Sequence, residues 1–481
     1  MKIKFNLLRF ALFFLFIIST ITYSQTVNFE EEKKINELFS QFDTKETPGA
    51  AIVLVKDGKI ILKGEYGMAD LEHNIPITSS TVFHIGSVSK QFTGYSILLL
   101  EKQGNLKLND KIIKYLPELP ECMSKITIRQ LLNHTSGIRE QENLFDMCGI
   151  SNSDVYSNEN TLEFVKNQKE LNFTPGEELE YCNTGFILAA IIIERITGKN
   201  LRDWAEENIF RPLEMVNTQF NDDNGRIIKN FSRPYFVPTG TDQIVKGILS
   251  SYNIGSTGIT TTISDIAKWL IHFGDPQIGG QAVMNKMLTD TSNLPNGVLV
   301  DYSYGLAVTN YKGVKVNFHS GGDSGYRAFD AYFPEFQFGI AVLSNFYSIN
   351  PQKMGFEIAE IYLKDKFTND PELKNQKVKQ STTNEEKINN ITLTKEELNN
   401  YIGKYLSEEL ETQFAIILNS DSLILKNLKN PAILLTPLGN DKFEGEYPMS
   451  VLHFVRGIDN KITGFKVSSA RARNVLFTKI Q

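Results

Sequence analysis

The sequence predicts two folded parts of different class. The first is an α+β part, with an antiparallel sheet flanked by helices and a helical subdomain, and the second is a small all-β barrel. A chain of 481 residues is longer than one hydrophobic core usually supports. Strand patterns stand at both ends of residues 25–365 with helical patterns between them, and a polar linker at 366–395 leads to closely spaced short strands in 396–481.

The first part is expected to begin with a helix and a hairpin. Apolar residues at helical spacing predict an amphipathic helix over 30–44. The apolar runs 50–55 and 60–62, joined by the turn Asp57-Gly58, predict two paired strands. Further helices are predicted at 92–100, 127–133, 185–197, in a segment through Trp269, and at 354–365.

Two of these helices carry end signals. Gly198 is the predicted C-cap of the helix at 185–197, and Thr262 or Ser264 is the N-cap of the helix through Trp269. The later strands follow the helices whereas the hairpin precedes them, so one antiparallel sheet is expected to be closed by both ends of this part. Those later strands are predicted at 304–311, 314–319, 327–333 and 338–345.

Residues 396–481 contain short alternating segments separated by turn residues such as Asn440-Asp441 and Asp459-Asn460. Short strands at this spacing are typical of a small barrel or sandwich. The predicted strands are 412–418, 422–426, 432–437, 441–444, 449–456, 461–467 and 474–479.

Residues 1–24 have the pattern of a secretory signal peptide. Three cations precede the apolar run 11–18, and the small residues Thr22 and Ser24 predict cleavage before Gln25. The expected location is therefore secreted or periplasmic, with no stable membrane anchor after cleavage. An N-terminal membrane anchor is the alternative, although its apolar run is short for a bilayer.

Composition and cysteines limit the possible partners. The formal net charge of −6 gives no basic excess that attracts phosphate backbones, so nucleic acid is not an expected partner. A disulfide between Cys122 and Cys148, or three buried thiols including Cys182, are equally consistent with the sequence, and the spacing matches no zinc site. The oligomeric state stays open.

The first chemical motif is Ser87-Val88-Ser89-Lys90, which lies where a turn opens the apolar helix. Residues three apart share a helix face, so the Lys90 amine can reach the Ser87 hydroxyl. A desolvated lysine with a lowered pKa can take the proton that makes serine a nucleophile. Ser87 would also lie at a helix N-terminus, where backbone N–H groups favour a developing oxyanion. An ordinary surface Ser and Lys is the alternative.

Two further motifs support a catalytic site. Tyr181-Cys182-Asn183 places a phenol that can relay a proton and an amide that can hold a substrate two residues apart in a turn. His319-Ser320-Gly321-Gly322 ends a predicted strand, where small residues let a substrate lie against the strand edge and a backbone N–H can complete an oxyanion hole. In the alternative interpretation, neither motif is catalytic. Tyr181 and His319 then only pack in the fold, and Asn183 and the two glycines only stabilise turns.

These three motifs, in this order, resemble those of the penicillin-recognising serine enzymes, which include class C β-lactamases, DD-peptidases and their esterase and peptidase relatives. The Tyr-x-Asn form resembles the class C branch. The resemblance covers roughly residues 30–365 and extends to the surrounding segments at 83–93, 128–137 and 174–176. It implies a fold similar to the serine β-lactamases and DD-peptidases.

The resemblance also implies a role for each residue. Ser87 is expected as the nucleophile of an acyl-enzyme, Lys90 as its general base, and Tyr181 as the group that assists proton transfer. Asn183 positions the substrate, together with His319, Ser320 and Gly321. The oxyanion hole would be formed by the backbone N–H groups of Ser87 and Gly322. This mechanism needs no metal or other cofactor.

One departure bears on the substrate. The family's third motif is usually Lys-Thr-Gly, whose Lys helps to hold the substrate carboxylate, whereas this chain has His319, which is mostly neutral at physiological pH. We therefore expect peptidase or esterase activity more than β-lactam hydrolysis, with D-amino-acid peptides or small acyl esters as leading substrates. A true β-lactamase is one alternative, and a catalytically silent protein that binds peptides or acyl ligands is another.

Two other assignments complete the expectations. His134 is expected to organise a turn. Residues from about 396 resemble the lipocalin-like β domain that is often appended to these hydrolases. That domain could cover the mouth of the active site, support oligomerisation or act as a passive stabilising module, and we favour the last.

Overall fold

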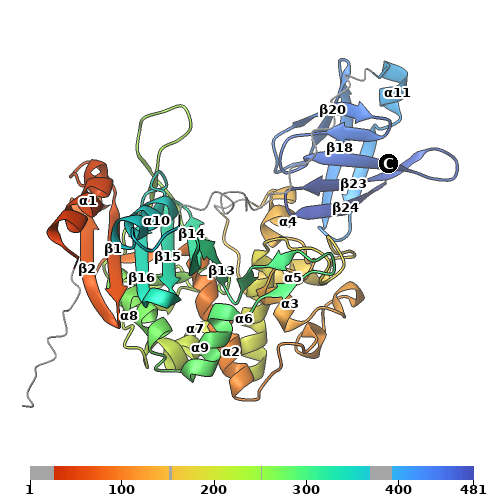
Figure 1. Ribbon diagram of the computed structural model, residues 1–481. Coiled ribbons are helices and arrows are strands. Elements are labelled where there is room, and N and C mark those ends of the chain that lie inside the picture. The colour runs from red at the N-terminus through yellow and green to blue at the C-terminus, as the bar shows by residue number, and fades with distance from the viewer. Residues whose placement is uncertain (1–26, 151–153, 251, 369–392, 481) are drawn as a thin grey trace, which may run out of the picture.

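The computed structural model describes residues 27–150, 154–250, 252–368 and 393–480. Figure 1 shows a larger part, in which helices flank a central sheet, and a smaller β part that lies beside α4. The larger part contains a seven-stranded antiparallel sheet, and the smaller part is a closed barrel. The predicted α+β class with a following all-β barrel is confirmed. The predicted signal peptide and most of the predicted linker lie outside the described residues.

The central sheet joins both ends of the larger part. Its order is β12-β13-β14-β15-β16-β1-β2, and β1 pairs with β16 from Ala50 opposite Ser344 to Lys56 opposite Phe338. The predicted closure of the sheet by both ends is therefore confirmed. Its strands are β1 (Ala50–Lys56), β2 (Lys59–Tyr66), β12 (Tyr302–Ser303), β13 (Leu306–Tyr311), β14 (Val314–Asp323), β15 (Tyr326–Phe333) and β16 (Phe338–Ser344).

Helices cover both faces of this sheet. On one face, α1 (Phe29–Phe39) and α10 (Pro351–Tyr362) bury Ile35, Phe39 and Ile358 against the strands. On the other face, α8 (Ile263–Gly274) packs on β1 and β16, followed by the helical region around α2 (Lys90–Lys102) and α6 (Asn183–Thr197). The other helices here are α3 (Ile128–Leu132), α4 (Gln141–Met147), α5 (Asn158–Lys166), α7 (Leu201–Ala205) and α9 (Gly280–Thr289).

Local signals set several helix boundaries. Gly198 ends α6 with a φ of 71°, the left-handed conformation that favours glycine, and the Thr262 side chain caps α8 by accepting the N–H of Asp265. Both predicted caps are thus confirmed, with Thr262 rather than Ser264 at the second. The helix predicted over 30–44 ends earlier, because residues 40–42 tighten into a 3₁₀ turn.

Short strands link the helical region to the sheet. The three-stranded set β5-β9-β6 lies next to the turn that carries Ser87, since β5 leads directly into it. The short strands are β3 (Met68–Asp70), β4 (Ile75–Pro76), β5 (Val82–His84), β6 (Gln219–Phe220), β7 (Tyr235–Phe236), β8 (Val245–Lys246), β9 (Ile259–Thr262), β10 (Ser292–Asn293) and β11 (Leu299–Val300).

The barrel follows the short helix α11 (Lys395–Asn399) and closes where β17 pairs with β24. Alternate side chains point inward, and Tyr405, Phe414, Phe465 and Phe477 form part of its buried core. Its strands are β17 (Gly403–Ser407), β18 (Thr412–Asn419), β19 (Ser422–Lys426), β20 (Ile433–Gly439), β21 (Lys442–Glu444), β22 (Val451–Arg456), β23 (Ile462–Ser469) and β24 (Ala472–Lys479).

The three cysteines are free thiols. The sulfur of Cys148 lies 3.5 Å from the carbonyl oxygen of Leu410, and that of Cys122 lies 3.8 Å from the carbonyl oxygen of Gln168. The possible Cys122–Cys148 disulfide is therefore wrong for this fold, and the alternative of free thiols holds. Cys148 and Cys182 are buried, whereas Cys122 is half-buried.

Candidate active site

Ser87 lies in a tight turn between β5 and α2. The 3₁₀ turn Gly86–Ser89 leads directly into α2, which begins at Lys90. Gly86 has a φ of 52°, and a Cβ at this position would stand 2.7 Å from the backbone nitrogen of Gly322. Only glycine meets both conditions without strain. The turn therefore packs tightly against β14 and brings the first predicted motif next to the third.

Lys90 is fully buried, and its amine has three polar neighbours. The nitrogen Nζ lies 3.0 Å from Ser87 Oγ, 2.7 Å from Asn183 Oδ1 and 2.7 Å from the carbonyl oxygen of Ser256. Burial in the protein interior is the main cause that lowers the pKa of Lys90 from 10.5 to about 7. The nearby carboxylates of Glu140 and Glu142 act in the opposite direction.

This geometry suits a neutral amine that accepts a proton. A neutral amine has two N–H donors and one lone pair. Asn183 Oδ1 and the Ser256 carbonyl can only accept, so they take the two donors. The lone pair is then left for the hydroxyl of Ser87, which donates to it. With a pKa near neutrality, Lys90 has both the geometry and the basicity of a general base.

The second motif is placed by the start of α6. Asn183 is the first residue of this helix, and Tyr181 precedes it by two residues. The Tyr181 phenol is hydrogen-bonded to Ser87, and its ring centroid lies 4.9 Å from Lys90 Nζ. Burial raises the pKa of Tyr181 above its ordinary value, so the phenol keeps its proton at neutral pH. The structure thus brings Ser87, Lys90, Tyr181 and Asn183 together.

The sequence had predicted that the third motif ends a strand. In the structure the motif lies inside β14. β14 continues to Asp323 because Gly321 and Gly322 pair with Ala328 and Arg327 of β15. On its other side, β13 pairs with β14 only as far as Phe318. From the next residue onward this edge faces the Ser87 turn, and a Cβ on Gly321 would stand 3.1 Å from the Ser87 nitrogen. The glycines permit this close approach.

His319 is buried and neutral. Its Nε2 lies 2.9 Å from the hydroxyl of Tyr302, and its Nδ1 lies 2.5 Å from the carbonyl oxygen of Ser320. A carbonyl can only accept, so Nδ1 carries the proton and Nε2 accepts from Tyr302. Burial and the charge of Lys90 lower the pKa of His319 to about 3. The expectation that His319 provides no fixed cation agrees with this geometry, and the side chain of Ser320 is exposed beside it.

Comparison with known proteins places this fold in a family. A family model described as Beta-lactamase matches residues 35–354, which is more than half of the chain. The chain belongs to the beta-lactamase family. The matched segment contains Ser87, Lys90, Tyr181 and His319.

Two curated relatives each match about three fifths of this chain. Protein flp of Staphylococcus aureus is 30% identical over 305 residues, or 62% of this chain and 59% of the relative. A D-aminopeptidase of Brucella anthropi is 29% identical over 286 residues, covering 58% and 52% of the two chains. The chain therefore spans less than two thirds of the length of these curated relatives.

Solved structures agree on the fold. The octameric penicillin-binding protein homologue from Pyrococcus abyssi has a TM-score of 0.61 at 23% identity, covering 93% of this chain and 99% of that one. The D-amino acid amidase from Ochrobactrum anthropi has a TM-score of 0.59 at 22% identity, covering 70% and 99%. At this identity the similarity establishes the fold.

Sequence reasoning missed several residues of the site in this family member. The Ser256 carbonyl binds Lys90 from a loop in which no pattern had been found. Glu140 accepts the backbone N–H of Asn183 at 2.6 Å, and Glu142 accepts its side-chain amide at 3.2 Å. A pair of carboxylates shortly after the 128–137 segment was the one available signal. The fourth missed residue, Arg471, comes from the barrel and had no local signal at all.

His134 supports the second motif from behind. Its Nδ1 accepts the backbone N–H of Cys182 at 3.1 Å, and its own carbonyl accepts that of Glu180 at 3.0 Å. Its ring centroid lies 4.4 Å from those of Tyr181 and Tyr302. His134 therefore holds the turn before α6 in place, as expected from the sequence.

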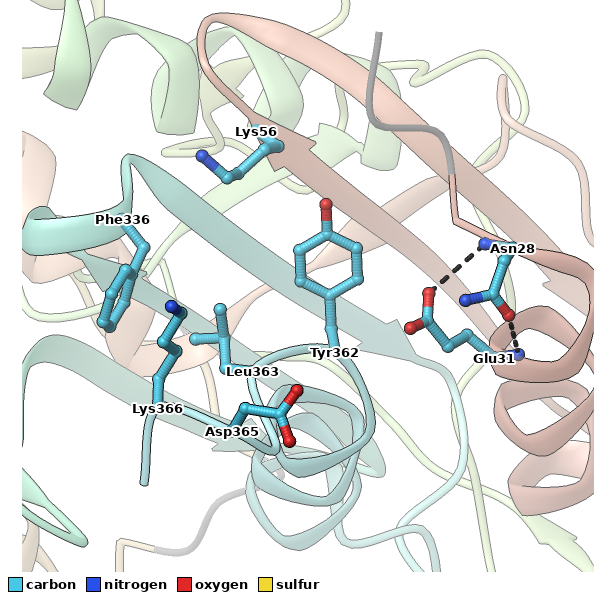
Figure 2. Close-up of a pocket in the computed structure, with 8 residues that line it drawn as sticks. All are labelled: Asn28, Glu31, Lys56, Phe336, Tyr362, Leu363, Asp365 and Lys366. Carbon is cyan, nitrogen blue, oxygen red and sulfur yellow. Dashed lines mark hydrogen bonds between the residues drawn. The ribbon is translucent and has the colours of Figure 1, made fainter. Parts of the chain in front are cut away.

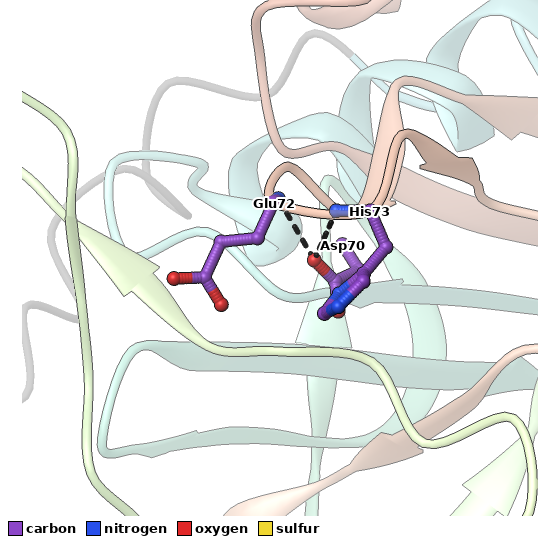
Figure 3. Close-up of side chains that lie close together, drawn as sticks. All are labelled: Asp70, Glu72 and His73. Carbon is purple, nitrogen blue, oxygen red and sulfur yellow. Dashed lines mark hydrogen bonds and ion pairs between the residues drawn. The ribbon is translucent and has the colours of Figure 1, made fainter.

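Two other features lie apart from this site. A cavity of about 370 Å³ lies between the start of α1 and the segment after α10. Figure 2 shows its lining, in which Asn28 and Glu31 are already hydrogen-bonded to each other in a capping box. Figure 3 shows Asp70, Glu72 and His73, which lie close enough together to bind a metal ion. The carboxylate of Asp70 accepts the backbone N–H groups of both neighbours, so this cluster stabilises its own turn.

Proposed function

We propose that this enzyme hydrolyses an amide or ester through a covalent acyl-enzyme on Ser87. The observation that carries the proposal is the 3.0 Å approach of Ser87 Oγ to a buried Lys90 amine whose other contacts are both acceptors. Ser87 Oγ attacks the carbonyl carbon and passes its proton to Lys90. The bond to the leaving group then breaks, and the leaving group takes up a proton from the Lys90–Tyr181 pair.

Deacylation reverses the same proton path. A water molecule attacks the acyl carbon and gives its proton to the pair, while Ser87 Oγ is released and reprotonated. The backbone N–H groups of Ser87 and Gly322 are proposed to bind the developing oxyanion in both steps. The close packing of the Gly86 turn against Gly322 supports this assignment.

The charges of the site favour a substrate with a free amino group. His319 is neutral, whereas the side chain of Glu142 is two-fifths exposed and touches the amide of Asn183. The guanidinium of Arg471 already faces both Glu140 and Glu142, and that of Arg327, which lies beside Gly322, stands 3.7 Å from the centroid of the Tyr347 ring. Burial raises the pKa of Glu140 and raises that of Glu142 to about 7, so Arg471, Glu140 and Glu142 together gain a net negative charge only as the pH rises and both carboxyls ionise. That charge attracts an ammonium and repels a carboxylate.

D-amino-acid amides and peptides are therefore the leading proposed substrates, and small acyl esters come second. The similarity to a D-aminopeptidase, a D-amino acid amidase and a D-stereospecific amidohydrolase supports this choice. β-Lactam hydrolysis is the weaker candidate because the position of the usual carboxylate-binding lysine is held by the neutral His319.

A small substrate panel tests the proposal. We expect D-alaninamide to be hydrolysed with a higher kcat/KM than L-alaninamide, N-acetyl-D-alaninamide or the β-lactam nitrocefin. The N-acetylated amide is the matched control, because acetylation removes the charge of the amino group and adds only a small neutral acyl group. Equal rates on the free and N-acetylated amides would contradict the ammonium argument, and nitrocefin as the best substrate would favour the β-lactamase alternative.

We also propose that the protein is exported, with residues 1–24 removed as a signal peptide. The cationic start, the apolar run and the small residues before Gln25 support this. Within the described ranges, no helix has the length and apolar character needed to cross a bilayer. The intact mass of the exported protein should correspond to a chain that starts at Gln25, and a mass that includes residues 1–24 would contradict the proposal.

A further inference from the structure

The barrel extends a charged side chain toward the catalytic residues. Arg471 stands in the turn between β23 and β24, next to Ala470, which adopts a φ of 47°. Its guanidinium donates to the backbone carbonyl of Tyr181 at 3.1 Å and lies 5.6 Å from the centroid of the Tyr181 ring. The same ring lies 4.9 Å from Lys90 Nζ. Arg471 and Lys90 therefore both lie close to a single aromatic ring.

The guanidinium also faces the two carboxylates of the site. It lies 3.5 Å from Glu140 Oε2 and 3.9 Å from Glu142 Oε2. These carboxylates bind the backbone N–H and the side-chain amide of Asn183, whose carbonyl oxygen binds Lys90. A continuous chain of polar contacts thus runs from the barrel to the proposed base.

Both backbone polar groups of Arg471, the N–H and the carbonyl, are hydrogen-bonded to the larger part. The backbone N–H of Arg471 donates to Asn143 Oδ1 at 3.0 Å, and its carbonyl accepts from Glu140 N at 3.1 Å and from Asn172 Nδ2 at 2.8 Å. These bonds attach the tip of the barrel hairpin to the larger part directly at the site. The favoured view of the barrel as a passive module does not account for such a specific attachment.

We propose that Arg471 is a positioning residue of the active site, through which the C-terminal barrel holds Glu140 and Glu142 against Asn183 and sets the protonation of Lys90. This inference deepens the proposed function and depends on the acyl-enzyme mechanism at Ser87. It assigns the barrel a part in the chemistry of the larger part.

Several buried groups face the amine of Lys90, and most keep one protonation state near neutral pH. Burial lowers the pKa of His134 and of His319, which are therefore neutral, and raises the pKa of Tyr181 and of Cys182, which therefore keep their protons. The titratable and charged groups around Lys90 are His134, Glu140, Glu142, Tyr181, Cys182, His319, Asp323 and Arg471.

Burial is the main cause of the lowered pKa of Lys90, and the remaining charges adjust it. The carboxylate of Asp323 is bonded to His84 at 3.0 Å, and this contact holds its pKa below the usual range. Glu140 and Glu142 raise the pKa of Lys90, whereas Arg471 lowers it. Glu140 is fully buried and its Oε1 has no partner among the described residues, so Arg471 is its nearest compensating charge.

The test is the pH dependence of Ser87 labelling by a fluorophosphonate, measured with the full-length enzyme. Labelling needs only the nucleophile and its base, so it does not depend on the choice of substrate. Replacing Arg471→Gln should raise the midpoint of the acid limb by about 0.5 to 1 pH unit, the size expected for loss of one charge beside the same aromatic ring. Labelling should then be about two- to fivefold slower at pH 7 and equal to wild type at pH 9.

Three variants serve as controls. Arg471→Lys keeps the charge and should restore the wild-type midpoint. Glu142→Gln removes an anion near Lys90 and should lower the midpoint, which keeps the test decisive even where Arg471→Gln does not fold. Arg473→Gln is the matched control, because Arg473 stands on the same hairpin and pairs with Glu178 at 3.0 Å and Glu180 at 2.6 Å without facing Lys90. Its midpoint should not move.

The outcomes separate the two proposals. An unchanged midpoint in Arg471→Gln and Glu142→Gln, or a loss of rate that is equal at every pH, would overturn the role of Arg471 and leave the acyl-enzyme mechanism standing. No labelling of the wild-type enzyme at any pH would overturn the acyl-enzyme mechanism itself.

Discussion

Replacing Lys90, the proposed base, should make the free energy of unfolding depend less on pH. Burial lowers the pKa of Lys90 from 10.5 to about 7, which corresponds to about 5 kcal/mol of unfavourable free energy for the charged amine. Above the unfolded value the amine is neutral in both states and this penalty is absent. As the pH falls below it, the unfolded state binds a proton that the folded state does not. The penalty therefore grows until the pH reaches about 7 and is then constant.

The variant Lys90→Met lacks this titration. Its stability relative to wild type should therefore decline as the pH rises from 7 to 9, by about 2 kcal/mol from the pKa values above. Methionine leaves Asn183 Oδ1 and the Ser256 carbonyl without their donor, which shifts the whole curve by a constant amount and does not change its slope.

Urea unfolding followed by tryptophan fluorescence provides the assay. The two tryptophans, Trp204 and Trp269, both lie buried in the larger part, so their signal reports the part that contains Lys90. Lys59→Met removes an exposed amine from β2 and is the matched control, whose curve should run parallel to wild type. Parallel curves for wild type and Lys90→Met between pH 7 and 9 would refute the claim that the buried amine is neutral.

Two further changes test the site and the junction of the two parts. Tyr181→Phe keeps the ring between Lys90 and Arg471 but removes the phenol, so kcat should fall by about 10²–10⁴ with unfolding free energy nearly unchanged; an unaltered kcat in steady-state assays would remove Tyr181 from the proton path. Arg139→Met breaks the buried ion pair of Arg139 with Glu409 of the barrel, at 2.7 Å, and should destabilise the protein by about 3–5 kcal/mol in urea unfolding. The double variant Arg139→Met/Glu409→Leu should recover part of that loss, and equal stability of the single variant and wild type would contradict this account of the junction.

The nucleophile and its base could be predicted because their geometry is local. Residues 87 and 90 lie one turn apart at the start of α2, so their spacing alone brings the two side chains onto one face. The other two motifs required the family resemblance, since 93 residues separate Lys90 from Asn183, and periodicity says nothing about contacts of that range.

Sequence patterns failed where tertiary contacts decide the structure. The predicted end of β14 at residue 319 was wrong because glycines have low strand propensity, whereas pairing with β15 carries the strand on to Asp323. Arg471 was not predicted because it contacts Tyr181 from 290 residues away and stands in an ordinary hairpin turn. Its significance depends on how the barrel docks, and this is decided by buried pairs such as Arg139–Glu409.

The mass of the fluorophosphonate-treated enzyme tests the central claim most directly. Ser87 Oγ should form a bond to phosphorus as fluoride leaves and the proton passes to Lys90. Wild type should therefore gain the mass of one phosphonyl group, which peptide mapping locates on Ser87, and Ser87→Ala should gain none. An unmodified wild-type enzyme would favour the silent binding protein of the same fold, and a modification on any other residue would contradict the assignment of Ser87 as the nucleophile.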